Sequence, residues 1–188
     1  MADIGGEWDK IIDGFRQLKM LAPEVRRGTD LCVETLRAGG KIMFCGNGGS
    51  ASQAQHLAAE LVGRYKIDRP AMAAAALTVD TSILTAVGND YGFDVVFARQ
   101  VEGIGRAGDL LIGLSTSGNS KNVILAFEAA KQKNIRTLAM TGRRPSRLSE
   151  LADFTLAMPS DSANSIQEMH LVVGHLICGE VERAFYGE

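Results

Sequence analysis

Two stretches of the chain predict its fold: IMFCGNGGS at residues 42–50 and LLIGLSTSGNS at residues 110–120. Each begins with a short apolar run, passes through a loop of glycine and small polar residues, and leads into a segment with helical spacing. Buried strands that alternate with helices in this way are typical of parallel sheets covered on both faces. We therefore expect an α/β protein, a flavodoxin-like three-layer α/β/α sandwich with a parallel sheet.

The alternation continues from Lys41 to the C-terminus without a change in composition, so we expect residues 1–188 to form a single domain. The predicted strands are Lys41–Cys45, Met72–Val79, Leu110–Leu114, Arg136–Met140 and Phe154–Ala157. The predicted helices are about Ser50–Val62, Thr81–Val87, Phe93–Val101, Lys121–Gln132, a short one near Leu148, and Asn164–Phe185.

A pair of helices is predicted before the alternating unit, within residues 1–38. Apolar residues recur at helical spacing from about Glu7 to Leu21, and Pro23 starts a second helix that ends at Gly39-Gly40. A helical hairpin placed outside the alternating unit is a plausible oligomerisation element. In a monomer the same apolar stripes would cover the sheet.

The composition excludes several functional classes. A net charge of −2 provides no basic surface for nucleic acid or for acidic lipid. No apolar run approaches the length of a membrane span, and residues 1–7 lack the basic and apolar segments of a signal peptide. The three cysteines lie in apolar segments without metal-type spacing. We expect a cytoplasmic protein.

The two loops predict the kind of ligand. Glycines let the backbone approach an anion closely, and the free N–H groups at a helix start attract it. The second loop offers four hydroxyls within six residues, from Ser115, Thr116, Ser117 and Ser120, and no lysine. This pattern suits a phosphomonoester held by neutral donors and matches neither the P-loop nor the dinucleotide fingerprint. The expected ligand is a small phosphorylated metabolite.

Two helices carry all the histidines of the chain. His56 and Glu60 are four residues apart and share a helix face, so they could ligate one cation, exchange a proton, or form an ordinary surface ion pair. On the last helix, Gln167 shares a face with His170 but lies about 12 Å along the axis from His175. Spacing alone does not choose between the two histidines. Asn89-Asp90 is predicted to form a turn, with side chains suited to sugar hydroxyls or serving only the turn itself.

Five short motifs occur in order between residues 45 and 170, and together they indicate a family resemblance that covers nearly the whole chain. The motifs are Cys45-Gly46-Asn47-Gly48-Gly49-Ser50, His56-x-x-x-Glu60-Leu61-x-Gly63-Arg64-Tyr65, Val87-Gly88-Asn89-Asp90-Tyr91-Gly92-Phe93, Ser115-Thr116-Ser117-Gly118-Asn119-Ser120 and Ile166-Gln167-Glu168-Met169-His170. Because of these motifs, the chain resembles the sedoheptulose 7-phosphate isomerases (phosphoheptose isomerases) of the sugar-isomerase (SIS) domain superfamily. One departure is Thr141-Gly142-Arg143-Arg144-Pro145, where relatives often have a glycine-rich turn.

The resemblance implies a homotetramer with active sites between subunits and one zinc ion per subunit. By position, the family's metal ligands fall on His56, Glu60, Gln167 and His175, so the resemblance, rather than spacing, selects His175. The implied catalytic residues are Glu60 as base and His175 as acid. The implied contacts to the sugar phosphate are Asn47, Gly48, Gly49, Glu60, Asn89, Asp90, Ser115, Thr116, Ser117, Ser120 and Gln167.

The implied reaction converts D-sedoheptulose 7-phosphate into D-glycero-D-manno-heptose 7-phosphate through an enediol, the first step of nucleotide-activated heptose biosynthesis. Two other functions occur in the superfamily. One is a non-catalytic scaffold that binds the replication initiator, which should lack an acid–base pair such as Glu60 and His175. The other is a sugar-phosphate sensor fused to a DNA-binding module, and the chain contains no helix-turn-helix or basic extension.

Overall fold

The computed structural model describes residues 3–187 and contains one five-stranded sheet with the order β2-β1-β3-β4-β5. All four neighbouring strand pairs are parallel. The strands are β1 (Ile42–Gly46), β2 (Ala74–Ala76), β3 (Leu110–Leu114), β4 (Arg136–Gly142) and β5 (Phe154–Met158). Each predicted strand is present. β2 is shorter than predicted because only its three alanines pair with β1 at the sheet edge.

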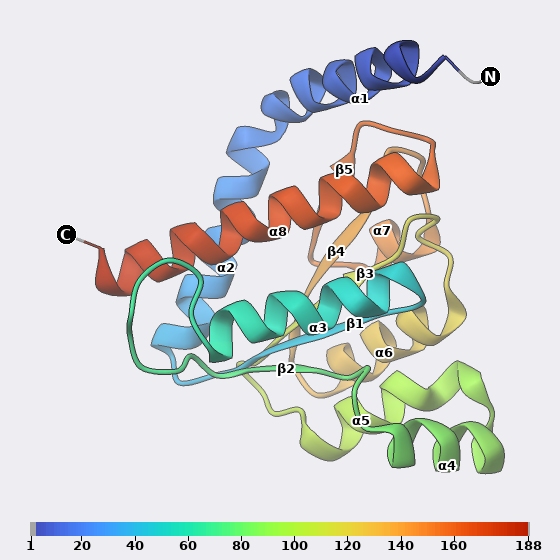
Figure 1. Cartoon of the computed structure of the whole chain (residues 1–188). Helices are drawn as coiled ribbons and strands as arrows, with labels where there is room; N and C mark the ends of the chain where they lie inside the picture. The colour runs from blue at the N-terminus through green and yellow to red at the C-terminus, as the bar shows by residue number, and fades with distance from the viewer. Residues whose placement is uncertain (1–2, 188) are drawn as a thin grey trace.

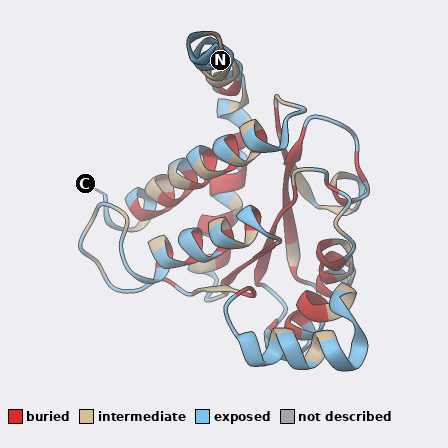
Figure 2. Cartoon of the chain, turned by 45° about the vertical axis from the view of Figure 1, so that its right-hand side comes forward, coloured by how far each residue is buried: buried red, intermediate tan, exposed pale blue. Residues whose placement is uncertain are grey.

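Helices cover both faces of the sheet (Figure 1). On one face, α2 (Ala22–Arg37), α3 (Gly49–Val62) and α8 (Ala163–Tyr186) share a core with Ile42 and Phe44 of β1. On the other face, α5 (Val96–Ile104), α6 (Lys121–Gln132) and α7 (Arg147–Leu151) share a core with Met43 and Cys45. Successive residues of a strand point to opposite faces, so every second residue of β1 enters each core. Figure 2 shows the buried strands between helices whose outer surfaces are exposed. The predicted three-layer sandwich is confirmed.

The segment after β2 differs from its prediction. α4 runs from Thr81 to Tyr91, a 3-10 helix η2 (Phe93–Val95) follows, and α5 begins only at Val96. The Asp80 side chain caps α4 by accepting from the Ile83 N–H at 2.9 Å, and Gly92 ends the helix at φ +92°. The turn predicted at Asn89-Asp90 is therefore wrong, because these residues form the last turn of α4.

The N-terminal helices form a bent arm. α1 (Ile4–Leu18) passes through the 3-10 helix η1 (Lys19–Leu21) into α2 with a helical backbone on both sides of η1, so no reversing turn occurs. The arm changes direction at η1 instead of folding back into a hairpin, and α1 extends away from the sheet (Figure 1). Ile4 and Trp8 on α1 are 70% and 60% exposed. The N-terminal part of the apolar stripe of α1 is therefore uncovered, whereas Phe15 and Leu18 near its C-terminal end pack on the core.

α8 lies along the sheet for 24 residues beside α3. Ile166, Met169, Val173 and Ile177 enter the core as the sequence indicates, whereas Leu176 is half exposed. Within residues 3–187, no helix combines the length and the apolar character that crossing a bilayer requires.

Candidate active site

The two predicted loops meet at the carboxyl edge of the sheet, as expected for loops after adjacent strands β1 and β3. The Asn47 side-chain amide donates to Asn122 Oδ1 at 2.8 Å, and the Asn122 amide donates back to Asn47 Oδ1 at 2.8 Å. This reciprocal pair joins the β1–α3 loop to the first turn of α6. Asn122 was not among the predicted site residues, and its only sequence signal is its position two residues after the serine-rich loop.

Some hydroxyls of the serine-rich loop form hydrogen bonds within the loop, and others line a pocket. Buried Ser115 contacts Ser120 Oγ at 3.0 Å and accepts from the Gly118 N–H at 3.1 Å, so these two serines shape the loop. Gly118 has φ +64°, and a Cβ there would collide with Ser146, so the loop requires glycine at this position. Ser117 is exposed and, with Thr116, lines a pocket of about 310 Å³. The hydroxyl residues of the loop that line this pocket are therefore Thr116 and Ser117, and the Ser117 Oγ also accepts from the Asn119 N–H at 3.2 Å.

Two arginines form part of the same pocket wall. Arg143 and Arg144 follow β4, and both pair with Asp161. These ion pairs hold the pKa of Asp161 below its ordinary value, since the Arg143 hydrogen bond favours the carboxylate. The pocket thus presents hydroxyls on one side and paired charges on the other.

Gln167 of α8 lies at the start of α3. A Cβ on Gly49 would approach both terminal atoms of the Gln167 side chain to 2.8 Å, so the Gln167 amide packs directly against Gly49 and would have to move if a side chain were added there. The Gln53 amide also donates to the Gln167 backbone carbonyl at 2.6 Å. Gly48, with φ +55°, precedes this contact. The predicted residues Asn47, Gly48, Gly49 and Gln167 therefore gather at the carboxyl edge of the sheet, near the N-terminus of α3.

A second group of predicted residues lies further along the same two helices. His56 and Glu60 on α3 meet His175 on α8, and one ligand atom from each lies within 4.8 Å of the others. His56 Nε2 is 2.8 Å from His175 Nε2, and Glu60 Oε1 is 3.2 Å and 4.0 Å from His56 Nε2 and His175 Nε2, respectively. The three residues form a possible metal-binding group. Two imidazoles and a carboxylate are a donor set that zinc commonly takes, and three protein ligands leave a position for substrate.

The structure separates the two histidines of α8. His170 is fully buried, its Nε2 lies 3.4 Å from the Thr141 carbonyl, and its Nδ1 has no hydrogen-bond partner among residues 3–187. Burial lowers its pKa to about 4, so the ring is neutral near pH 7. His175 instead faces α3 at the surface. Packing of the two helices therefore favours His175 over His170 for the site, a choice that spacing left open.

Three of the four expected metal ligands converge within one chain, and Gln167 does not join them. It contacts Gly49, which precedes His56 by seven residues, or about 10 Å along α3. Asn89 and Asp90 also lie elsewhere, since α4 packs through Leu84 and Val87 on the core at the opposite face of the sheet. Both are exposed, and the Asn89 amide donates to Asp90 Oδ1 at 2.8 Å.

Comparison with known proteins identifies the family. The SIS domain family model matches residues 9–142. A phosphoheptose isomerase of Akkermansia muciniphila is 62% identical over 177 residues, which cover 94% of each chain. The chain belongs to the phosphoheptose isomerase family. Phosphoheptose isomerase structures from Neisseria gonorrhoeae and Francisella tularensis align with TM-scores of 0.90 and 0.93 at 42% and 34% identity. The first alignment covers 95% of this chain and 96% of the other, and the second covers 96% of both.

Proposed function

We propose that the chain isomerises D-sedoheptulose 7-phosphate to D-glycero-D-manno-heptose 7-phosphate. The observation that carries this proposal is the His56–Glu60–His175 group on α3 and α8, the two helices that also meet at Gly49 and Gln167 beside the β1–α3 loop. Membership of the phosphoheptose isomerase family supports the substrate class. A scaffold or a sensor would need neither a carboxylate nor an imidazole held together at a solvent-accessible site.

The isomerisation moves one proton between adjacent carbons. Glu60 removes a proton from C1 of the ketose while His175 donates a proton to the C2 carbonyl oxygen, which yields the enediol. Glu60 then returns a proton to C2, and His175 takes the proton from the C1 hydroxyl as the aldehyde forms. The proton count of the protein is restored at the end. A positioned base and acid are what this chemistry requires.

The proposed metal is zinc, held by His56, Glu60 and His175. When bound, zinc supplies positive charge that polarises a carbonyl and stabilises negative charge on the sugar oxygens. A carboxylate that holds the metal tightly is not a free base at the same moment, and an imidazole nitrogen that holds the metal has no proton to donate. Every test of Glu60 must therefore measure metal content and proton transfer separately.

The substrate phosphate is proposed to bind at the serine-rich loop. Thr116 and Ser117 offer accessible hydroxyls, and no side chain caps the N-terminus of α6, which begins directly after Ser120. Gly48, Gly49 and Asn47 bring a second loop to the same edge. Holding the phosphate there orients the reacting carbons by binding energy from the far end of the substrate.

We further propose a homotetramer whose subunits complete one another's sites. Ile4, Trp8 and Ile12 form an exposed apolar stripe on α1, and an apolar groove of about 390 Å³ lies between the arm and α8. Leu176, next to His175, lines that groove. Assembly over this surface would bring a neighbour close to the metal-binding group, and Gln167, Asn89 and Asp90 would act in a site shared between subunits. Sedimentation of a fully active monomer would contradict this assembly.

The compartment is proposed to be the cytoplasm. All three cysteines, Cys32, Cys45 and Cys178, are buried and free. Burial raises the pKa of Cys45 and Cys178 to about 12, so these thiols are protonated and unreactive near neutral pH. Free, buried thiols are typical of proteins that fold under reducing conditions.

An NMR assay of the purified protein with sedoheptulose 7-phosphate tests the function. The proposal predicts appearance of the aldose phosphate, loss of turnover after chelation, and recovery on addition of zinc. Absence of any aldose signal with zinc-loaded, folded protein would contradict it.

A further inference from the structure

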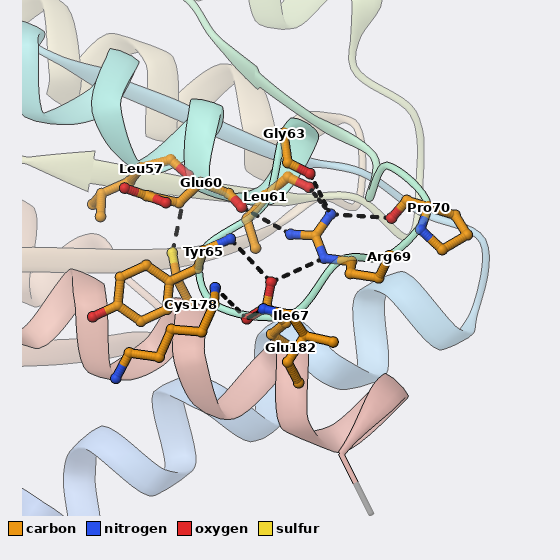
Figure 3. A network of polar contacts seen from close by, with 11 residues as sticks. Leu57, Glu60, Leu61, Gly63, Tyr65, Ile67, Arg69, Pro70, Cys178 and Glu182 are labelled. Carbon is orange, nitrogen blue, oxygen red and sulfur yellow. Dashed lines mark hydrogen bonds and ion pairs between the residues drawn. The ribbon is translucent and has the colours of Figure 1, made fainter.

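A buried ion pair connects the end of α3, the loop that follows it and α8. Arg69 and Glu182 lie 3.2 Å apart, and both side chains are 1% exposed. The Arg69 guanidinium donates to the carbonyls of Leu61 at 2.6 Å and Glu60 at 2.8 Å, as well as to Gly63 and Pro70 (Figure 3). The last carbonyls of a helix have no partner within the helix. Arg69 therefore caps the C-terminus of α3 directly after Glu60.

Glu182 holds the loop that contains Arg69. Its carboxylate accepts from the backbone N–H groups of Tyr65 at 3.0 Å, Lys66 at 2.7 Å and Ile67 at 2.9 Å (Figure 3). Burial alone would raise the pKa of Glu182, but the three N–H donors and Arg69 outweigh it and lower the pKa. The residues 63–70, which we call the strap, are thereby tied to α8.

The strap places the Tyr65 ring on His175. The two rings are stacked, with centroids 5.4 Å apart and an interplanar angle of 18°. Gly179 leaves room for the ring, because a Cβ there would lie 3.1 Å from Tyr65 Cε1. His175, Gly179 and Glu182 follow one another at i, i+4 and i+7 and so share one face of α8. Glu182 fixes the Tyr65 backbone, and the Tyr65 ring covers one side of the His175 imidazole.

A requirement for stability alone does not explain this arrangement. Removing two charges from water costs several kcal/mol per ion, and apolar residues of similar volume often stabilise a protein equally well. No apolar pair could accept from three consecutive N–H groups and also cap α3. The hydrogen bonds made by Arg69 and Glu182 fix the position of the strap relative to both helices that carry the metal-binding group.

We propose that Arg69 and Glu182 are positioning residues of the active site, which act through the strap and Tyr65 to hold His175 toward His56 and Glu60. The inference rests on the proposed function only for the role of His175 in turnover. The structural claim is that the Arg69–Glu182 ion pair determines the orientation of the His175 imidazole, and this claim does not depend on the reaction. Outer partners that orient a metal ligand typically change metal affinity by about 10- to 100-fold.

The test measures zinc affinity and the NMR signal of His175 in full-length variants. Tyr65→Leu removes the ring without touching the ion pair, and is expected to weaken zinc binding about 10-fold or more. It should also remove the ring-current shift from the His175 imidazole protons. Tyr65→Phe, which restores the ring, should restore both readouts. Tyr186→Leu, at the exposed end of α8, is the matched control for loss of a tyrosine.

Glu182→Gln tests the ion pair itself, and Asp109→Asn is its matched control. Asp109 is also a buried carboxylate that accepts from two backbone N–H groups and pairs with a cation, Lys41, but its partners are Lys41 and Arg106, which lie outside the strap. Both variants should lower the melting temperature. Only Glu182→Gln should weaken zinc binding and shift the His175 signal.

Equal zinc affinity and an unchanged His175 signal in folded Tyr65→Leu would overturn the inference, as would equal effects of Glu182→Gln and Asp109→Asn. Where Glu182→Gln does not fold, Gly179→Ala displaces the Tyr65 ring by a few tenths of an ångström and should shift the same signal. None of these readouts requires turnover. Failure of the wild-type protein to isomerise its substrate would therefore contradict the proposed function. It would not contradict this inference, which the zinc affinity and the His175 signal test separately.

Discussion

The serine-rich loop and the His56–Glu60–His175 group are both candidate parts of one active site, but they are built differently. The loop is contiguous, and its internal hydrogen bonds join residues at most five positions apart, such as Ser115 with Ser120, while the segment after β4 fixes its outer side through the Leu148 N–H, which donates to the Gly118 carbonyl. The metal-binding group joins residues 119 positions apart, and it exists only because α3 and α8 pack side by side. Local sequence can specify the first, whereas tertiary packing must specify the second.

A glycine on α8 and the strap explain why α3 and α8 lie so close together. A Cβ on Gly174 would collide with Leu57 at 2.5 Å, so glycine at this position lets the two helices approach next to His175. At their far ends the strap connects both helices through Arg69 and Glu182. A small residue on one side of the group and a buried ion pair on the other thus fix the distance between its members.

Glu60→Gln is expected to have the largest effect, because it removes the proposed base from the part of the site that packing creates. A positioned acid or base typically contributes about 10²- to 10⁴-fold to kcat, so most turnover should be lost in a folded protein. Steady-state kinetics with parallel zinc analysis measures this. Glu168→Gln, an exposed carboxylate on α8, is the control. Near-normal kcat in Glu60→Gln would remove this group from the chemistry.

Ser117→Ala tests the serine-rich loop, and it should affect KM, whereas Glu60→Gln should affect kcat. Loss of one hydrogen bond to a charged phosphate costs about 1.5–3 kcal/mol, which corresponds to a rise in KM of roughly 10- to 150-fold. The value of kcat should change little. Ser82→Ala, an exposed serine on α4, serves as the control. A folded Ser117→Ala variant with unchanged KM would show that the phosphate binds elsewhere.

These two regions also show what sequence patterns can predict. The strand-to-helix corners, the order of strands and helices, and the hydroxyl-rich loop follow from local periodicity and composition. The convergence of His175, but not His170, on α3 does not follow from spacing, because it depends on how α8 is rotated on the sheet. The same is true of Asn89 and Asp90, where the Asp80 cap and Gly92 extend a helix through residues that usually favour turns.

The roles of Arg69 and Glu182 could not be predicted from the sequence either. Their separation of 113 residues gives no pattern, and the strap between Gly63 and Pro70 has no regular secondary structure. Long-range polar networks of this kind are visible only after the fold is known.

The smallest predicted effect is the pH-dependent contribution of His170 to stability. Since the pKa of His170 is about 4 in the folded protein and about 6.5 when unfolded, the unfolded chain binds more protons below pH 6.5. His170 therefore destabilises the fold progressively as the pH falls from 6.5 towards 4, by about 2 kcal/mol at pH 5.

Urea unfolding of metal-free wild-type protein and His170→Asn at pH 7.5 and pH 5.0 measures this contribution. The variant should lose less stability on acidification than the wild type, and it should retain zinc binding because His175 is unchanged. An identical loss of stability in both proteins would contradict the assignment of His170 as a buried, neutral core residue.

The most direct test of the account is deuterium exchange into sedoheptulose 7-phosphate in D₂O, followed by NMR. At saturating substrate, zinc-loaded wild-type protein and Ser117→Ala should both incorporate deuterium at the carbons that exchange a proton through the enediol. Zinc-loaded Glu60→Gln should incorporate almost none. Exchange by Glu60→Gln at the wild-type rate would contradict the claim that the site formed by α3 and α8 carries the proton transfer.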